Sequence, residues 1–290
     1  MLWGVIGNTG LLGSELMRSL EAARIRAKGF SRENLDLDGS IQNLVKSVSQ
    51  QGDPEVDVLV NCVGHTQVDQ AESEQDQAHL VNGEYPRKLA ASAKEVGARF
   101  IHISTDYVFD GTSTAPYKTT DTPNPQSVYG QSKHAGEIAV QESGADYQIF
   151  RTAWLYGANG DCFPKTVARV LHEKGQMNVV KDQVGQPTWT KDLAKLIIAH
   201  QGVDESLRPR MVHATASGSC SWYEFACEIA ISLRYDPDQV IIPITTADYP
   251  TPAKRPAYSV LDNQNETGLV IGNWRDRWRE AAPLVLAEYL

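Results

Sequence analysis

The stretch from Leu2 to Leu20 restricts the fold more than any other part of the chain. A short apolar run, Leu2 to Ile6, leads into Gly7-Asn8-Thr9-Gly10-Leu11-Leu12-Gly13, after which leucines recur at helical spacing up to Leu20. This order predicts a strand, a glycine-rich turn and a helix. Gly7 permits a tight turn, Gly10 lets the backbone approach a pyrophosphate, and Gly13 lets the helix pack closely on the strand. Because the start of a helix favours an anion, the stretch predicts dinucleotide binding rather than a purely structural turn.

The second predicted strand, Ile25 to Phe30, bears on the choice of cofactor. In such folds the residue just past this strand reads the adenosine ribose, and an acid there accepts the 2′-hydroxyl of NAD. This chain has Ser31-Arg32 instead, and an arginine accommodates the 2′-phosphate of NADP. An ordinary surface arginine beside Glu33 is the alternative reading. We therefore expect NADPH, with NADH as the alternative.

The alternation of strands and helices predicts the fold class. Val56 to Gly64 is a nearly continuous apolar run, typical of a parallel strand covered on both faces, and Phe100 to Ile103 and Tyr147 to Phe150 continue the series. We expect a doubly wound parallel-sheet Rossmann domain over residues 1–153. The alternation breaks down beyond Arg151, which predicts a smaller C-terminal α/β substrate-binding domain, mainly over 154–290. Segments around 182–215, including Met211 to Ala214, would return to the main sheet.

Polar side chains follow the third and fourth predicted strands. Gly64-His65-Thr66 comes after the third strand and Ser104-Thr105-Asp106-Tyr107 after the fourth. Ligands of doubly wound sheets bind beyond the carboxyl ends of the strands, and hydroxyl and carboxylate groups there suit a sugar. A helix cap is the alternative for Ser104 to Asp106. His65 is a lone histidine without metal-ligand spacing, which favours a pocket wall over a proton donor.

Tyr129 and Lys133 lie four residues apart on a helix predicted from about Ser127 to Gln141, and so share one helix face. The ordinary pKa of tyrosine is about 10. A neighbouring ammonium would lower the pKa of Tyr129 towards neutral pH, where proton transfer is most effective. The spacing by itself favours an ordinary surface pair on an amphipathic helix. The glycine turn and the Thr105 hydroxyl favour a proton donor.

Three residues of the C-terminal part are candidate substrate contacts. A ring such as Trp154 can stack on a base, and cations such as Lys254 and Arg255 can pair with a diphosphate. A buried tryptophan and two solvated cations are the alternative.

Composition and charge narrow the function classes. A formal net charge of −9 argues against sequence-independent binding of nucleic acid and against binding to an anionic membrane surface. The 4 cysteines show neither C-x-x-C pairing nor metal spacing, which is typical of reduced cytosolic cysteines. We see no signal peptide, and no run approaches the roughly 20 apolar residues of a membrane span. We expect a cytoplasmic protein without nucleic-acid or membrane partners, and no metal site.

With these motifs in place, the chain resembles the extended short-chain dehydrogenase/reductase superfamily and, within it, the dTDP-4-dehydrorhamnose reductases. The resemblance rests on Gly7 to Gly13, Ser104 to Gly111, Tyr129 to Glu137, Arg151 to Gly157, Asp182 to Thr188, Ser221 to Ala226 and Tyr249 to Ser259. It implies NADPH-dependent reduction of the 4-keto group of dTDP-4-dehydro-6-deoxy-L-mannose to dTDP-L-rhamnose, the last step of dTDP-L-rhamnose synthesis.

The resemblance also implies a set of site residues. Thr105, Tyr129 and Lys133 would form the catalytic group. The residues implied at the cofactor are Gly7, Thr9, Gly10, Leu11, Leu12, Gly13, Ser31, Arg32, Asp36, Leu37, Cys62, Val63, Gly64, His65, Thr66, Tyr129 and Lys133. Those implied at the dTDP-sugar are Ser104, Thr105, Asp106, Tyr107, Tyr129, Trp154 and Arg255.

The resemblance leaves some questions open. Some members hold magnesium in an acidic cluster between subunits; Glu15 matches one acid, but Lys191 stands where another is expected. Magnesium and a homodimer therefore stay open. Three alternative functions remain: reduction of another dTDP-4-keto-6-deoxysugar, an epimerase with tightly held NAD, and a non-catalytic regulatory subunit resembling the β subunit of methionine adenosyltransferase.

Overall fold

The computed structural model describes residues 1–31, 35–40, 43–44 and 56–290. Within this part of the chain, six parallel strands form the main sheet in the order β10-β5-β4-β3-β1-β2. The strands are β1 (Leu2–Ile6), β2 (Arg26–Phe30), β3 (Val58–Asn61), β4 (Arg99–Thr105), β5 (Tyr147–Thr152) and β10 (Met211–His213). The predicted doubly wound parallel sheet is thus confirmed.

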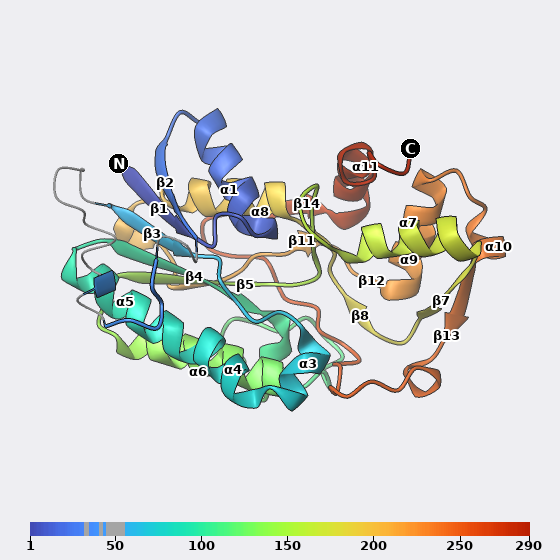
Figure 1. Ribbon diagram of the computed structural model, residues 1–290, viewed down its shortest axis with the longest axis horizontal. Helices are drawn as coiled ribbons and strands as arrows, with labels where there is room; N and C mark the ends of the chain where they lie inside the picture. Colours follow the sequence, from blue (N-terminus) through green and yellow to red (C-terminus); the bar gives the residue numbers. More distant parts are fainter. Residues whose placement is uncertain (32–34, 41–42, 45–55) are drawn as a thin grey trace.

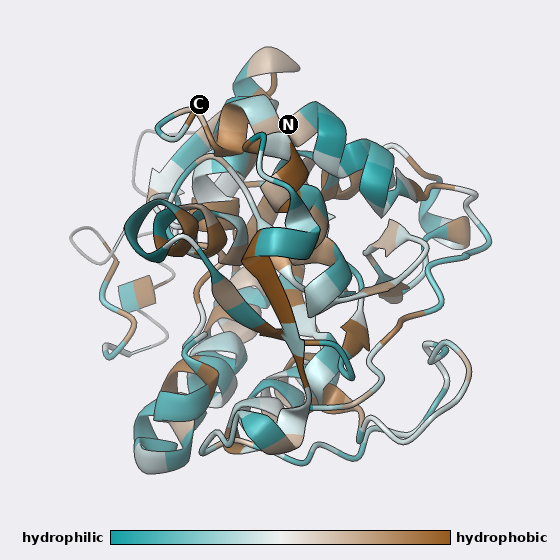
Figure 2. Cartoon of the chain, turned by 90° about the vertical axis from the view of Figure 1, so that its right-hand side faces the viewer, coloured by the Kyte–Doolittle hydropathy of each residue, from teal (hydrophilic) through white to brown (hydrophobic). Residues whose placement is uncertain are grey.

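Both faces of this sheet are buried, which explains the apolar runs. Val5 and Val60 face a cluster that contains leucines of α1 (Leu11–Ala22) and α8 (Thr190–His200). Ile6 and Leu59, on the opposite face, pack with α5 (Tyr85–Glu95) and α6 (Val128–Glu142). Helices α1 and α8 lie above the sheet in Figure 1, and α5 and α6 lie below it. Hydrophobic residues accordingly concentrate in the central strands, whereas the outer helices carry hydrophilic ones (Figure 2).

The chain reverses its direction of winding at β1. This strand pairs with β2 on one side and with β3 on the other, and all three are parallel. Ligands of doubly wound sheets bind at such a switch point, outside the carboxyl ends of the strands. Two short helices follow β3, namely α3 (Val68–Ser73) and α4 (Gln75–His79), and the π-helical turn η1 (Leu80–Glu84) joins them to α5. The turn η2 (Asp106–Val108) follows β4.

The C-terminal part combines helices with short strand pairs. Its pairs are β6 (Leu155–Tyr156) with β9 (Thr188–Trp189), β7 (Met177–Val180) with β13 (Ile241–Ile244), β8 (Val184–Gly185) with β12 (Cys220–Ser221), and β11 (Ala216–Ser217) with β14 (Ile271–Asn273). Its helices and turns are α7 (Phe163–Lys174), η3 (Glu205–Leu207), α9 (Trp222–Ser232), α10 (Pro237–Val240), η4 (Thr246–Asp248) and α11 (Trp274–Val285). We propose the division into two parts after residue 153, with α8 and β10 returning to the main sheet.

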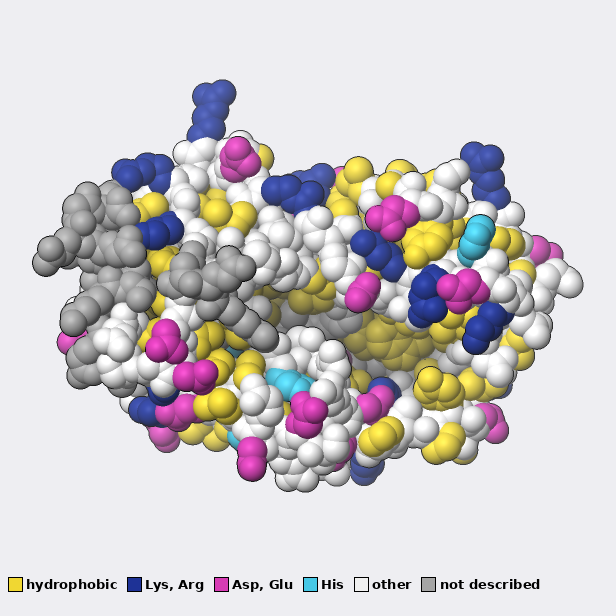
Figure 3. Space-filling model, viewed as in Figure 1, with side chains coloured by type: hydrophobic (Ala, Val, Ile, Leu, Met, Phe, Trp, Pro, Cys, Tyr) yellow, Lys and Arg dark blue, Asp and Glu magenta, His cyan; other side chains and the backbone are white. Residues whose placement is uncertain are grey.

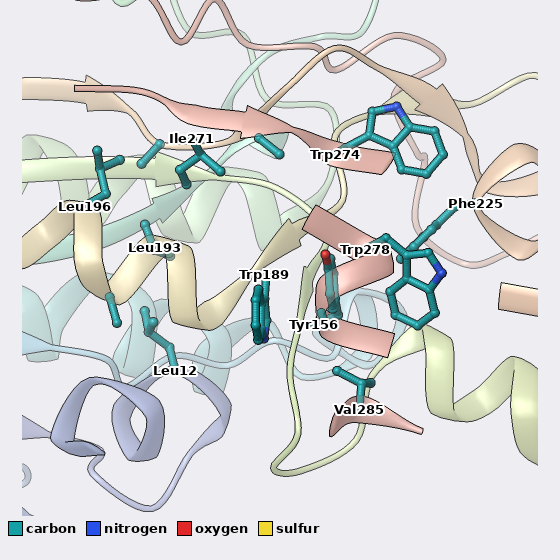
Figure 4. Close-up of a cluster of buried hydrophobic side chains, with 14 of the residues drawn as sticks. Leu12, Tyr156, Trp189, Leu193, Leu196, Phe225, Ile271, Trp274, Trp278 and Val285 are labelled. Atoms are coloured by element: carbon teal, nitrogen blue, oxygen red, sulfur yellow. The ribbon is translucent and has the colours of Figure 1, made fainter. Parts of the chain in front are cut away.

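The two parts share one hydrophobic core. Figure 4 shows Leu12 of α1 and Leu193 of α8 in the same cluster as aromatic side chains of the C-terminal part. Trp278 packs edge-on against Tyr156 and Phe225, with ring centroids 5.4 and 5.3 Å apart. This shared core fixes the C-terminal part against the carboxyl edge of the sheet. Among the described residues, no helix has the length and apolar character needed to cross a membrane.

Candidate active site

The glycine turn has the backbone geometry predicted for it. Gly7 follows β1 with φ +79°, in the left-handed region that favours glycine, and its N–H donates to the carbonyl of Phe30 at the end of β2 (2.8 Å). A Cβ on Gly13 would lie 2.1 Å from the carbonyl oxygen of Gly7, so α1 approaches the turn as closely as glycine permits. Thr9 and Gly10 are exposed, whereas the Leu12 side chain is buried in the core. Leu12 can therefore contact a pyrophosphate through its amide, because first-turn amides have no intrahelical acceptor.

The residues expected near the adenosine lie beyond β2. Ser31 is half-buried and follows the strand directly, whereas Arg32 lies outside the described residues. The Asp36 carboxylate accepts the N–H groups of the turn that follows it, and Leu37 is buried. Lys88, on α5, donates to the carbonyl oxygens of residues 37, 38 and 39 at 3.3, 3.2 and 3.1 Å. This lysine, which the sequence did not point to, holds the turn in place.

The segment after β3 runs beside the glycine turn. The Cys62 N–H donates to the carbonyl of Ile6 (3.0 Å), and Val63 packs against Gly7. Burial raises the pKa of the Cys62 thiol to about 12, so this thiol is uncharged at neutral pH. The His65 imidazole is largely buried and its Nε2 lies 3.6 Å from the Glu74 carboxylate, while Thr66 is exposed. Cys62 to Thr66 thus line the same edge as the glycines.

Asn82 is a functional candidate that sequence reasoning missed. It is fully buried in η1, where its Oδ1 accepts the His65 N–H (2.8 Å) and its Nδ2 donates to the His65 carbonyl (3.0 Å). Nδ2 also donates to the Ser132 hydroxyl at 3.0 Å. Asn82 therefore ties the segment after β3 to the helix that bears Tyr129. The sequence signal that could have indicated Asn82 was a single amide side chain directly after the apolar residues Leu80 and Val81. The structure adds that Asn82 lies in a π-helical turn, and such turns occur frequently at functional sites.

Ser104 to Tyr107 stand at the end of β4. Ser104 and Thr105 pair in register with Arg151 and Thr152 of β5, and both are buried. The Thr105 hydroxyl donates to the Asp106 carboxylate (3.0 Å) and accepts the Tyr107 N–H (3.2 Å). Burial raises the pKa of Asp106 to about 6, against hydrogen bonds that lower it. Thr105 thus starts the η2 turn and faces the position of Tyr129.

Tyr129 lies in the first turn of α6 and is held against the end of β4. Ser127 caps the helix by accepting the Gly130 N–H (3.1 Å), and a Cβ on Gly130 would lie 2.3 Å from the Tyr107 carbonyl. The rings of Tyr107 and Tyr129 meet edge to face at 5.4 Å. Burial raises the pKa of Tyr129 to about 12, and its hydrogen bond with Thr105 opposes that rise. The Tyr129 hydroxyl is therefore protonated at neutral pH.

Lys133 does not act on Tyr129 as the spacing predicted. Its ammonium donates to the carbonyl oxygen of Ile103 at 2.6 Å, and its side chain is buried. Burial lowers the pKa of Lys133 to about 8, and the charge of Glu137 opposes the fall. The predicted fall in the Tyr129 pKa is thus replaced by a rise, because burial outweighs the effects that favour the phenolate. Lys133 still lies at the carboxyl edge, near Gly64.

A buried ion pair lies one helical turn after Lys133. Arg151 donates from Nε and a terminal nitrogen to the two oxygens of Glu137, at 2.8 and 2.7 Å. Their side chains are 3% and 1% exposed. This pair joins β5 to α6 and fixes the helix that carries Tyr129 and Lys133.

Trp154 and Arg255 lie beside a cavity in the C-terminal part. Trp154 has φ +45°, rare for a bulky residue, and one face of its ring is stacked on Trp222 at 3.5 Å. Trp222 and Phe163 line a cavity of about 620 Å³ whose wall includes Arg255. Figure 3 shows a hollow with hydrophobic side chains in the region of α7. Arg255 is bound to Asp69 of α3, and Lys254 donates to Gln126 (3.4 Å).

The residues considered for magnesium have other contacts. Glu15 forms an ion pair with Arg18 (3.1 Å), and the Lys191 ammonium lies 4.8 Å above the Trp189 ring. Across the described residues, no three His, Cys, Asp or Glu side chains are grouped so as to hold a metal ion.

Two relatives are similar in sequence to almost the whole of this chain. A relative named dTDP-4-dehydrorhamnose reductase, from Burkholderia thailandensis, is 41% identical over 288 residues, which cover 93% of this chain and 94% of the relative. A relative from Streptomyces antibioticus, named probable dTDP-4,6-dihydroxy-2-methyloxan-3-one 4-ketoreductase, is 40% identical over 294 residues, covering 99% of this chain and 96% of the relative.

The fold and the whole length of the chain agree with a single family. The structure of dTDP-4-dehydrorhamnose reductase from Bacillus anthracis in complex with NADP matches with a TM-score of 0.87 at 33% identity, covering 97% of this chain and 98% of that one. The family model described as RmlD substrate binding domain matches residues 3–290. The predicted resemblance is therefore confirmed, and the chain belongs to the RmlD substrate binding domain family.

Proposed function

We propose that this protein reduces the 4-keto group of dTDP-4-dehydro-6-deoxy-L-mannose with NADPH and yields dTDP-L-rhamnose. The broader class is a reductase of dTDP-4-keto-6-deoxysugars, and the two named relatives belong to it. The observation that carries the proposal is the hydrogen bond between Tyr129 and Thr105 at the end of β4, the strand whose Ile103 carbonyl accepts the Lys133 ammonium.

The residues around the glycine turn fit a dinucleotide. The position of a Cβ on Gly13 is taken by the Gly7 carbonyl, so this turn tolerates no side chain there, and the first-turn amides of α1 face the edge where Thr9 and Gly10 are exposed. The relative from Bacillus anthracis was crystallised with NADP. We propose that Gly7 to Gly13 hold the pyrophosphate and that Cys62 to Thr66, with Lys133, lie on the nicotinamide side. NADPH supplies the hydride for the carbonyl carbon when bound.

The protonation state of Tyr129 suits a reduction. Its hydroxyl keeps its proton at neutral pH because burial and the negative charge of Asp106 both raise its pKa. It can therefore donate that proton to the carbonyl oxygen of the substrate as negative charge develops there. Thr105, hydrogen-bonded to Tyr129, orients the Tyr129 hydroxyl. Lys133 would hold the nicotinamide ribose, because its ammonium is fixed at the end of β4.

The cavity of the C-terminal part fits the nucleotide of the substrate. Its wall combines aromatic rings with polar and cationic side chains, among them Phe163, Trp222, Lys174, Asn178, Gln183 and Arg255. Rings can stack on a thymine base and cations can pair with a diphosphate. We propose that Trp222 faces the base and that Trp154, stacked behind it at 3.5 Å, bounds the sugar. Because Trp154 follows β5 beside Thr105, the hexose would lie between them.

A comparison of substrates tests the proposal. The protein is incubated with NADPH or NADH and either dTDP-4-dehydro-6-deoxy-L-mannose or its 4-keto-6-deoxy-D-glucose precursor, and the dTDP-sugar formed is identified by chromatography and NMR. The proposal predicts dTDP-L-rhamnose, with NADPH preferred over NADH. Faster turnover of the D-sugar would instead make the protein a reductase of another dTDP-4-keto-6-deoxysugar, an alternative favoured by the relative from Streptomyces antibioticus at nearly the same identity.

A further inference from the structure

Asp69 and Arg255 form an ion pair that bridges the candidate site from the two parts of the protein. Asp69 lies in α3, just after the segment that follows β3, and Arg255 lies in the loop after η4. The two terminal nitrogens of Arg255 donate to the two carboxylate oxygens at 3.0 and 2.6 Å. The Ala253 N–H donates to the same carboxylate at 3.2 Å. Asp69 thus fixes both the guanidinium and the backbone that carries it.

Arg255 lies near both the nucleotide cavity and Tyr107, the neighbour of Tyr129. It lines the cavity together with Trp222 and Phe163. Its positive charge also opposes the rise that burial causes in the pKa of Tyr107, and the ring centroids of Tyr107 and Tyr129 lie 5.4 Å apart. A nucleoside diphosphate sugar with its base in the cavity and its hexose at Tyr129 must therefore pass its diphosphate by Arg255.

We propose that Asp69 is a positioning residue, which holds the Arg255 guanidinium at this junction so that it meets the diphosphate of the substrate. The inference rests on the proposed function, since it takes a nucleoside diphosphate sugar as the ligand. Asp69 itself does not touch the substrate.

The geometry lets Arg255 serve both partners at once. A guanidinium has five N–H donors. The bonds to Asp69 engage one N–H of each terminal nitrogen, so the remaining three donors are available to phosphate oxygens. Arg255 is 23% and Asp69 39% exposed, so an incoming diphosphate can reach the guanidinium without displacing the carboxylate. Holding a long side chain in its bound position beforehand lowers the entropic cost of binding.

Removal of the Asp69 carboxylate tests the proposal. In Asp69→Ala the dissociation constant of dTDP, measured by calorimetry, and KM for the dTDP-ketosugar should rise by about tenfold. We expect kcat and the affinity for NADPH to change by less than about twofold, because among the described residues Asp69 forms its hydrogen bonds with Ala253 and Arg255 and not with Tyr129 or the glycine turn. Asp69→Glu, which keeps a carboxylate, should restore most of the dTDP affinity. Asp69→Asn supplies the same test if Asp69→Ala does not fold.

A second ion pair provides a matched control. Arg277 binds Asp192 through two nitrogens at 2.8 and 3.1 Å and, like the Asp69 pair, it joins segments far apart in the chain. Asp192→Ala should lower thermal stability and leave dTDP affinity unchanged. Asp69→Ala should add no further loss of dTDP affinity in an Arg255→Met background, because its effect acts through Arg255.

The outcomes separate this inference from the function on which it rests. Unchanged or tighter dTDP binding by Asp69→Ala would overturn the inference and show that Asp69 is a structural tie or a competitor of the diphosphate. Equal losses of dTDP and NADPH affinity would also overturn it, because a general disturbance of the fold would then explain both. If the wild-type protein binds NADPH but not dTDP, the proposed function fails first, and this inference fails with it.

Discussion

The buried ion pair between Glu137 and Arg151 offers the clearest test of how the helix of Tyr129 is held. Burial raises the pKa of Glu137, but hydrogen bonds from Arg151 and His134 outweigh this effect and lower the pKa to about 2. A fall in pKa from 4.5 to about 2 corresponds to about 3 kcal/mol of the free energy of unfolding. Glu137→Gln also leaves the buried Arg151 charge without its partner, and breaking such pairs costs about 3–5 kcal/mol. We therefore expect Glu137→Gln to lose about 3–5 kcal/mol at pH 7.

The sign of the pH dependence follows from the lowered pKa. The folded protein keeps Glu137 ionised, so its contribution to stability is fully present above the ordinary pKa of 4.5 and is lost as pH falls towards 2. Equilibrium unfolding in urea, followed by circular dichroism, should show a constant difference between wild type and Glu137→Gln from pH 8 to 5. Below about pH 4.5 that difference should shrink.

A matched exposed pair serves as the control for this experiment. Glu84 and Arg87 form an ion pair at the surface, where their side chains are 37% and 50% exposed. Pairs of this kind contribute about 0.5 kcal/mol, so Glu84→Gln should change stability little. A loss below 1 kcal/mol in Glu137→Gln, or a difference that grows below pH 4.5, would refute the reasoning.

Three further changes have outcomes that the structure predicts. Burial raises the pKa of Asp106 from 3.8 to about 6, so the stability linked to its proton is lost as pH rises through 6; Asp106→Asn should gain up to about 3 kcal/mol at pH 8 in urea unfolding, and a loss there would contradict this. Gly13→Ala places a Cβ 2.1 Å from the Gly7 carbonyl oxygen, so it should weaken NADPH binding, measured by fluorescence, by at least about tenfold. In the control Gly202→Ala the added Cβ lies 3.4 Å from its nearest neighbour, and NADPH should bind normally. Trp222→Ala removes the ring stacked on Trp154 and should raise KM for the dTDP-ketosugar about three- to tenfold with NADPH affinity unchanged; an unchanged KM would remove Trp222 from the site.

Local patterns predicted the sheet because its central strands are buried on both faces. The runs around Val5, Val60 and Phe150 have no polar alternation, and their partners recur at helical spacing, as in Leu12 and Leu16. Two-residue strands such as Val184–Gly185 were not predicted, because two residues show no periodicity. The short helices α3 and α4 were missed for a related reason, since their single buried residues, Ala71 and Ala78, make no apolar stripe.

The candidate site was predicted where chain order dictates position. Carboxyl ends of parallel strands meet at one edge, so Thr105 and the glycine turn could be placed together from the sequence. Contacts between segments far apart in the chain could not be predicted, because no local sequence pattern indicates them. Asn82 and Asp69 act on residues 17 and 186 positions away. The environment of Tyr129 was likewise hidden, because burial raises its pKa more than any neighbour lowers it.

The central claim is that Tyr129 donates the proton in an NADPH-dependent reduction of a dTDP-4-ketosugar. Its most direct test follows NADPH oxidation at 340 nm with dTDP-4-dehydro-6-deoxy-L-mannose for wild type and Tyr129→Phe, whose NADPH affinities are compared as a control. General acid catalysis contributes about 10²–10⁴-fold, so kcat of Tyr129→Phe should fall within that range while wild type forms one dTDP-L-rhamnose per NADPH oxidised. Turnover by Tyr129→Phe at the wild-type rate, or no NADPH oxidation by wild type, would contradict the claim.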